Sequence, residues 1–176
     1  INSATAYMNR VTGNNVDGKA IGDYGILIRD SDRNVISNNI FRNCAAQGIY
    51  LDGTSTTNTI VGNRVISNVL QGIWLNGAGV DGNRVISNVV EGRNYQDNGV
   101  YVLNGDGNVV TNNRVSGNVA NGIYFVGDAA SNRVVGNVVY SNATAGLVLT
   151  NGRANQNLFV RNVLFRNGAR GFDIMT

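Results

Sequence analysis

An asparagine returns every 24 or 25 residues along the whole chain, seven times in phase. These positions are Asn9, Asn34, Asn58, Asn83, Asn108, Asn132 and Asn157. A second asparagine follows five residues after each of them, at Asn14, Asn39, Asn63, Asn88, Asn113, Asn137 and Asn162. Self-similarity at a fixed period of this length is typical of solenoids, in which each repeat forms one coil that stacks on the next. The chain is therefore expected to form a solenoid of seven coils.

Apolar residues lie two positions apart between the polar corners, which is the period of a β-strand. Each coil should hold three short strands, and like strands of successive coils should pair in parallel. Their inward side chains should form four apolar columns that make up the core. The columns are Val11, Ile36, Ile60, Val85, Val110, Val134 and Phe159; Val16, Phe41, Val65, Val90, Val115, Val139 and Leu164; Ile26, Ile49, Ile73, Val100, Ile123, Leu147 and Phe172; and Ile28, Leu51, Leu75, Val102, Phe125, Leu149 and Ile174.

The predicted fold class is all-β: a right-handed parallel β-helix of seven coils of about 25 residues, with three short strands per coil. The handedness follows from the crossover rule for parallel strands, and from contrast with left-handed β-helices, which usually repeat in hexapeptides. The 30 asparagines are assigned mainly to structure. Asparagine tolerates the left-handed backbone of a sharp corner, and its amide can bond the same amide one coil away.

A third corner position continues the repeat and is followed by a glycine in every coil. The corner holds Lys19, Cys44, Asn68, Arg93, Asn118, Asn142 and Asn167, and the glycines are Gly25, Gly48, Gly72, Gly99, Gly122, Gly146 and Gly171. We expect a third ladder at this corner, with Cys44 as a buried or half-buried member. The glycines are expected to leave room at the outer surface of the sheet.

Composition excludes several classes of chemistry. The chain has no histidine, which excludes a Ser-His-Asp triad and histidine-ligated metals, and its single cysteine excludes an internal disulfide. The net charge of +3 comes mostly from scattered arginines, with Lys19 as the only lysine, so nucleic acid is not an expected partner. No apolar run approaches the length of a membrane span, and no membrane association is expected.

Residues 1–176 are expected to form one β-helix domain, without an internal boundary. The ends cut the repeat in phase near Ile1 and Ile174, which favours a segment of a longer solenoid or a unit that associates end to end. Two coils carry extra residues before their glycine, in segments 17–24 and 91–98. Such insertions emerge as loops on one side of a solenoid and often carry function.

The residue two positions after each glycine should point outward, because its neighbours on both sides point inward. This column holds aromatic side chains in four consecutive coils, at Tyr50, Trp74, Tyr101 and Tyr124, and polar Asn76 lies two positions beyond Trp74. Aromatic rings beside hydrogen-bonding groups are what a polysaccharide requires, so these five residues are the candidate substrate-binding set. The alternatives are that the rings stack on one another or bury against a side-by-side copy.

The acidic residues give weaker candidates for chemistry. Asp30, Asp32 and Asp52 could assemble a paired-carboxylate site or bind Ca²⁺, although solvated turn aspartates are the simpler interpretation. Arg29 beside Asp52 is expected to be an exposed ion pair. The weak catalytic candidates are Arg29, Asp30, Asp52 and Asp173.

The repeat Asn-x-Val-x-x-Asn-x-Val-x-x-Asn-x-x-x-Gly-Ile-x-Leu resembles the parallel β-helix repeat of the carbohydrate-binding and sugar-hydrolase (CASH, NosD-like) superfamily, from Asn9 to Ile174. Within it, the chain is most similar to β-helix modules of mannuronan C5-epimerases, whose signature is Tyr-Gly-Phe-Asp-Pro-His-acid. The segment Tyr24 to Asp30 keeps Tyr-Gly and the acid, but has Leu27 and Arg29 at the Asp and His positions. Gly171-Phe172-Asp173 keeps Gly-Phe-Asp, with Met175 at the His position.

The predicted function is a polysaccharide-interacting module that binds an extended glycan along its outward aromatic face. The alternatives are a uronate lyase or C5-epimerase-like catalytic module, and a purely structural surface or fibre solenoid. Whether the chain is an enzyme stays open at this point. An extracellular or cell-surface location is expected.

Overall fold

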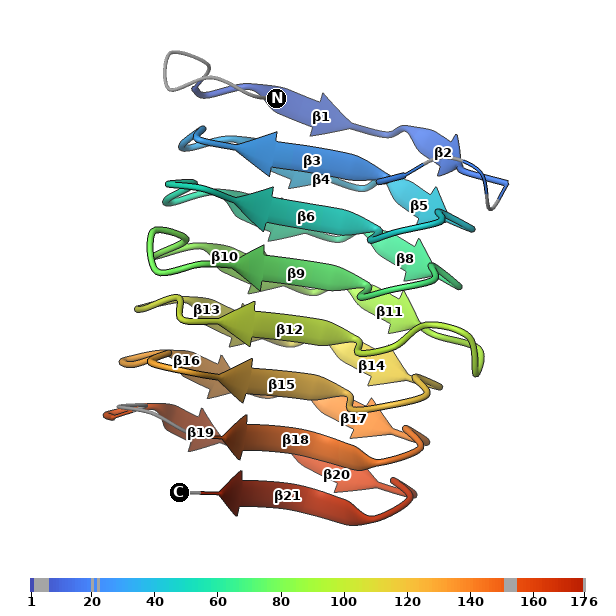
Figure 1. The fold of residues 1–176 in the computed structure, drawn as a ribbon, viewed down its shortest axis with the longest axis vertical. Helices are drawn as coiled ribbons and strands as arrows, with labels where there is room; N and C mark the ends of the chain where they lie inside the picture. Colours follow the sequence, from blue (N-terminus) through green and yellow to red (C-terminus); the bar gives the residue numbers. More distant parts are fainter. Residues whose placement is uncertain (2–6, 20, 22, 151–154, 176) are drawn as a thin grey trace.

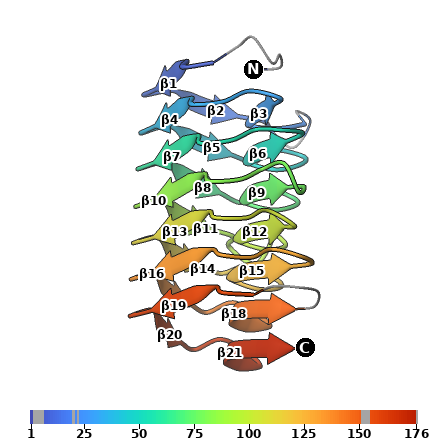
Figure 2. The same cartoon turned by 90° about the vertical axis from the view of Figure 1, so that its left-hand side faces the viewer.

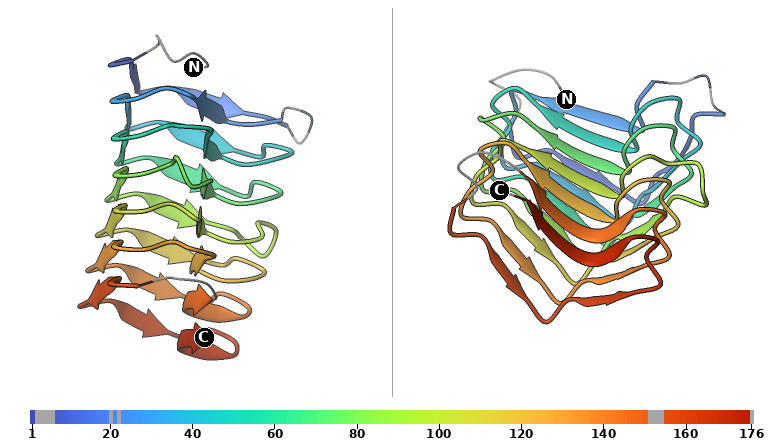
Figure 3. Two further views of the ribbon diagram at one scale, coloured as in Figure 1. Left: turned by 60° about the vertical axis from the view of Figure 1, so that its left-hand side comes forward. Right: turned by 60° about the horizontal axis from the view of Figure 1, so that its bottom comes forward.

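The computed structural model describes residues 1, 7–19, 21, 23–150 and 155–175. Over this range the chain winds through seven stacked coils, each with one strand in each of three parallel sheets (Figure 1). Like strands lie above one another along one axis (Figure 2). Seen obliquely from one end, the three sheets surround a single interior (Figure 3). The predicted fold class is confirmed.

Each sheet contains seven strands, one from each coil, in chain order. The first sheet consists of β1 (Arg10–Thr12), β4 (Val35–Ser37), β7 (Thr59–Val61), β10 (Arg84–Ile86), β13 (Val109–Thr111), β16 (Arg133–Val135) and β19 (Leu158–Val160). The second consists of β2 (Asn15–Asp17), β5 (Ile40–Arg42), β8 (Arg64–Ile66), β11 (Val89–Glu91), β14 (Arg114–Ser116), β17 (Val138–Tyr140) and β20 (Val163–Phe165). The third consists of β3 (Ile26–Arg29), β6 (Ile49–Asp52), β9 (Ile73–Asn76), β12 (Val100–Leu103), β15 (Ile123–Val126), β18 (Ala145–Thr150) and β21 (Arg170–Met175).

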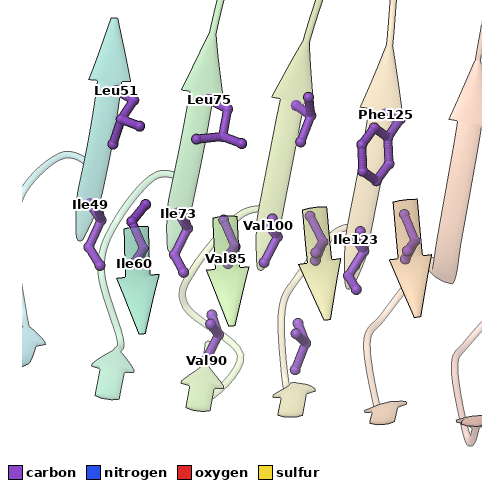
Figure 4. Packing of buried hydrophobic residues seen from close by; sticks show 14 of the residues in the cluster. Ile49, Leu51, Ile60, Ile73, Leu75, Val85, Val90, Val100, Ile123 and Phe125 are labelled. Carbon is purple, nitrogen blue, oxygen red and sulfur yellow. The ribbon is translucent and has the colours of Figure 1, made fainter. Parts of the chain in front are cut away.

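The four predicted core columns are confirmed by the strand registers. In the third sheet, Ile49 pairs with Ile73 and Ile73 with Val100, and the neighbouring column places Leu51 beside Leu75. Figure 4 shows these side chains in rows that run from strand to strand across successive coils. In the middle coils they are completely buried, whereas members of the last coil such as Ile174 are 58% exposed. The core is therefore continuous along the described coils.

Two asparagine ladders run the length of the stack, as predicted. In the second ladder, the Asn63 backbone N–H donates to Asn88 Oδ1 at 2.9 Å, and the Asn88 backbone N–H donates to Asn113 Oδ1 at 2.9 Å. The Asn88 side chain also donates through Nδ2 to the Ile60 carbonyl at 2.9 Å. Each buried amide thus satisfies backbone groups at a corner, where the sheet ladder is interrupted.

The third ladder exists, but Arg93 is not part of it. Asn68 Nδ2 donates to Gln96 Oε1 at 3.4 Å, and Gln96 Nε2 donates to Asn118 Oδ1 at 2.8 Å. The extra residues of segment 91–98 shift the chain outward before it returns to the corner, so the buried Gln96 fills the position and Arg93 is exposed. Cys44 is buried at the same corner, as expected, and burial raises the pKa of its thiol.

The glycine column has a different physical reason from the expected one. A Cβ at Gly122 would lie 2.2 Å from Val139 Cγ1 and 2.6 Å from the Gly146 carbonyl oxygen. The missing side chains therefore allow the corner to close against the second sheet and the next coil. The prediction that they leave room at the outer surface is wrong, because these positions face the interior of the turn.

Within the described part of the chain, no helix has the length and hydrophobicity needed to cross a membrane.

Candidate functional site

The outward face of the third sheet carries a row of five aromatic side chains, here called the aromatic strip: Tyr24, Tyr50, Trp74, Tyr101 and Tyr124. The strand registers place the four predicted members in one column, next to one another in successive coils. Tyr24 joins them from the turn before β3. The sequence repeat missed it, because Tyr24 does not lie in the strand column that the repeat defines.

The rings of the aromatic strip stack on one another along the solenoid axis. Successive ring centroids are 5.3, 4.9, 5.7 and 5.2 Å apart, with interplanar angles between 24° and 41°. This spacing follows from the distance of about 4.8 Å between paired strands. As a result, Tyr50 is only 7% exposed, whereas Tyr24 at the end of the stack is 39% exposed. Within the strip, the rings present mainly their edges outward, so their faces are used on one another.

A polar network lies beside the strip on the same face. Arg29 Nε donates to Asp52 Oδ2 at 2.9 Å, and Arg29 Nη2 lies 2.7 Å from the same oxygen. Asn76 Nδ2 donates to Asp52 Oδ1 at 3.1 Å and to the Tyr50 hydroxyl oxygen at 2.6 Å. The predicted ion pair is confirmed, and it is partly exposed, with the side chains of Arg29 and Asp52 at 41% and 22%. The network joins three coils and reaches the edge of the aromatic strip.

The charge state of this face follows from its contacts. The hydrogen bond to Asp52, followed by the attraction of its carboxylate, raises the pKa of Arg29, which therefore keeps its proton at any physiological pH. Burial is the main cause that raises the pKa of Tyr50 and Tyr101. The face thus offers the protonated guanidinium of Arg29, the carboxylate of Asp52 that is paired with it, the amide of Asn76 and neutral phenols.

The raised pKa of Tyr101 predicts a loss of stability in alkali. A phenol whose folded-state pKa lies above the unfolded value contributes stability that is present below the ordinary pKa of 10.0 and is lost as the pH rises through the folded value. We expect the urea midpoint to fall between about pH 9 and about pH 11. Tyr101→Phe should reduce this fall, because phenylalanine cannot ionise. Equal pH dependence in both proteins would contradict the prediction.

Asp30 and Asp32 hold turns in place. Asp32 Oδ1 accepts hydrogen bonds from the backbone N–H and the hydroxyl of Thr56, at 2.7 and 2.9 Å. Asp30 Oδ1 accepts a hydrogen bond from the Thr54 backbone N–H at 3.0 Å, and Asp30 has the left-handed φ of 49° that a corner needs. In the residues that the structure describes, no three His, Cys, Asp or Glu side chains are placed to hold a metal ion. No Ca²⁺ site is therefore built from Asp30, Asp32 and Asp52.

Asp173, the remaining catalytic candidate, lies in the last coil. Its carboxylate is 2.7 Å from Arg170 Nη1, three residues earlier on the same strand. The register continues the column of the aromatic strip through Val148 to Asp173. Asp173 is therefore separated by several coils from Arg29 and Asp52, and the structure does not bring the four catalytic candidates into one site.

A hollow of about 520 Å³ lies at the turns between the second and third sheets. It is lined by Asp17, Lys19, Asn43, Ser67, Val69, Arg93 and Tyr95. Asp17 is the last residue of β2, and the others follow β2, β5, β8 and β11, whose turns lie one above another in Figure 1. The sequence repeat predicted the two insertions that contribute Lys19 and Arg93. It did not predict the hollow that lies between them.

The coil geometry, the ladders and the core columns together define a parallel β-helix. The family described as "Right handed beta helix region" matches residues 2–90 and 75–176. The chain belongs to this right-handed β-helix family.

Solved structures with the same fold include the periplasmic alginate epimerase AlgG, with a TM-score of 0.72 and 18% identity over 97% of this chain. They also include the enzymatically active domain of tailspike protein 2 of bacteriophage CBA120, with a TM-score of 0.53 and 16% identity over 94% of this chain. The chain spans 46% of the epimerase and 25% of the tailspike structure. A search of curated protein sequences finds no significant match. At these identities the likeness shows the fold.

Proposed function

We propose that this β-helix binds an extended polysaccharide along the outward face of the third sheet. The observation that carries the proposal is the combination, on one flat sheet, of the aromatic strip with the Arg29–Asp52–Asn76 network. Sugars have apolar ring faces and many hydroxyl groups, so they need apolar surface and polar groups side by side. The proposed binding residues are Tyr50, Trp74, Tyr101, Tyr124 and Asn76.

The stacked arrangement determines how such a ligand would make contact. Aromatic edges carry the positive part of the ring quadrupole, so they suit the oxygen atoms of a sugar chain that lies across the strip. The amide of Asn76 and the carboxylate of Asp52 supply hydrogen-bonding groups next to Tyr50 of the strip. The stacking also fixes the rings before binding, which lowers the entropy lost when a glycan is ordered on them.

The similarity to an alginate epimerase supports a polysaccharide as the ligand, because that protein acts on one. It also supports the proposal that the chain works in an extracellular or cell-surface setting, since that epimerase is periplasmic. The fold supplies the long sheet face in both proteins. A shared fold does not fix the ligand, so the side chains on this face must carry the specificity here.

Binding fits the contacts of this face better than proton abstraction does. Arg29 is held protonated by Asp52, so it cannot act as the base of a lyase or an epimerase. Asp52 accepts hydrogen bonds from Arg29 on Oδ2 and from Asn76 on Oδ1, so both carboxylate oxygens already have partners within the face. The same groups remain suited to hold a ligand.

Titration with soluble polysaccharides should change the fluorescence of Trp74, the only tryptophan, which lies in the middle of the strip. Tyr101→Leu should weaken binding by about tenfold or more, because it removes a ring next to Trp74. Leucine and valine occupy this column in other coils, at Leu27 and Val148, so the substitution suits the fold. Calorimetry gives the affinity of each variant independently of the fluorescence.

The matched control is Tyr140→Leu, which removes an aromatic ring from β17 of the second sheet, where Tyr140 stacks on Phe165. It should leave glycan affinity unchanged. Equal loss in both variants, or no binding of any acidic or neutral polysaccharide, would contradict the proposal. A dimer that dissociates on Tyr101→Leu without any glycan binding would instead assign the strip to self-association. New absorbance from unsaturated uronate during the titration would assign the face to a lyase.

A further inference from the structure

The hollow between the two insertions has walls from two coils and a floor from the coils between them. Lys19 follows β2 on one side, and Arg93 and Tyr95 follow β11 on the other. Asn43 and Ser67 form the floor, where both have left-handed φ values of 54° and 51°. Such tight corners keep the second and third coils short here, so the volume of about 520 Å³ stays open between the longer loops.

The far wall of the hollow is tied firmly to the solenoid. Gln96 is completely buried and joins the third ladder through Asn118. The Asp97 backbone N–H donates to the Leu70 carbonyl at 3.0 Å, and the Tyr95 N–H donates to the Gly92 carbonyl at 3.0 Å. Tyr95 therefore stands on a loop that is anchored on both sides, which favours a preformed site over a loose loop.

Tyr95 differs from the rings of the aromatic strip in what its faces contact. It is 60% exposed, and within the described residues it stacks on no other ring. In the strip, by contrast, each inner ring has an aromatic neighbour on both faces. Tyr95 thus lines the hollow with an exposed ring that no other described ring covers.

The groups in and around the hollow include more cations than anions. Asn43 Nδ2 donates to Asp17 Oδ1 at 3.0 Å, and Arg42 Nε lies 3.1 Å from Asp17 Oδ2. The hydrogen bond from Asn43, followed by the one from the Lys19 backbone N–H and by the charges of Arg42 and Lys19, lowers the pKa of Asp17.

On the other side, Glu91 pairs with Arg64 at 2.9 Å, and Arg93 is farther from the same carboxylate, at 3.9 Å. Within the described residues, the Lys19 ammonium makes no ion pair. The groups that line and flank the hollow therefore carry an excess of positive charge, with Lys19 and Arg93 on opposite walls.

We propose that this hollow binds an acidic sugar unit, whose ring lies against Tyr95 and whose carboxylate or sulfate group is bound by Lys19 and Arg93. The Asn43 amide and the Ser67 hydroxyl lie at the floor for the remaining sugar oxygens. An aromatic face provides apolar contact for the sugar ring, and the two cations select for a negative charge. The site is distinct from the outward face of the third sheet, and it does not depend on glycan binding there.

Calorimetric titration of the full chain at low salt tests the site with three probes: a galacturonate tetramer, a chondroitin sulfate tetrasaccharide and cellotetraose. We expect at least one acidic probe to bind, and cellotetraose to bind about tenfold more weakly or not at all. Comparison of the two acidic probes tells whether the site takes carboxylate or sulfate. Added salt should weaken the binding of the acidic probe, because salt screens the attraction between exposed charges.

Lys19→Gln combined with Arg93→Gln should reduce acidic binding by about tenfold or more, and Tyr95→Ala should reduce it while Tyr95→Phe retains it. The matched control is Arg84→Gln, which replaces an exposed arginine on β10 of the first sheet. It should leave the affinity for the acidic probe unchanged. Tyr101→Leu should also leave this binding intact, which separates it from the proposed face of the third sheet. Equal losses from Arg84→Gln, equal binding of cellotetraose, or no binding of either acidic probe would overturn the proposal.

Discussion

Asn88→Ala should lower the free energy of unfolding by about 2–4 kcal/mol, because it removes the acceptor of the buried Asn63 backbone N–H. It also removes the bonds from Asn88 Nδ2 to the Ile60 carbonyl and to Asn113 Oδ1. Asn63 and Asn88 are each only 1% exposed, so water cannot replace these partners. Urea unfolding followed by circular dichroism and Trp74 fluorescence measures the change.

Asn14→Ala is the matched control at the same ladder position in the first coil. Asn14 is exposed, and its amide donates to the Thr12 carbonyl and to Asn39 Oδ1 at the solvent boundary. Its loss should cost less than about 1 kcal/mol, since water can bond the groups left behind. Equal destabilisation by the two substitutions would show that burial in the ladder does not set the cost.

Gly122→Ala should destabilise the protein by about 3 kcal/mol or more, through overpacking. The new methyl group would lie 2.2 Å from Val139 Cγ1, 2.6 Å from the Gly146 carbonyl oxygen and 2.8 Å from Asn142 Nδ2. Val139 belongs to the core, Asn142 to the third ladder, and the Gly146 oxygen to the backbone of the next coil. None of them can move away easily, so the clash can be relieved only if the coils separate. The urea midpoint and the thermal midpoint should both fall.

Gly171→Ala tests the same column where there is space. A Cβ at Gly171 would meet only Leu164 Cβ, at an ordinary contact distance of 3.7 Å. Alanine should therefore be neutral or stabilise by up to about 1 kcal/mol, because it reduces the freedom of the unfolded chain. A large loss of stability from Gly171→Ala would mean that the glycine column is needed for backbone conformation instead of for close packing.

The periodic features of the fold could be predicted because each coil meets only copies of itself. Once Asn63 and Asn88 are known to be equivalent, stacking places them together, and the alternation of the strands decides that Val65 points inward. The same logic placed Tyr50, Trp74 and Tyr101 in one outward column, and the registers confirm this placement.

Prediction failed where a coil departs from the repeat. Segment 91–98 has extra residues, and counting along the chain assigned Arg93 to the ladder that Gln96 occupies. Spacing cannot locate the extra residues within a loop, because burial of an amide against Asn118 decides which residue returns to the corner. Tyr24 was missed for a similar reason, since it reaches the aromatic strip from a turn.

The asparagine repeat by itself determined the architecture: the number of coils, the core columns, two complete ladders and the outward position of the aromatic rings. These are local patterns that repeat at one period, so stacking adds little information to them. The tertiary structure decided how the exposed groups are used. It showed that the strip rings cover one another's faces, that Asp30 and Asp32 hold turns, and that the exposed Tyr95 lines a hollow together with Lys19 and Arg93. These outcomes depend on contacts between non-equivalent side chains of different coils, and such contacts leave no period in a sequence.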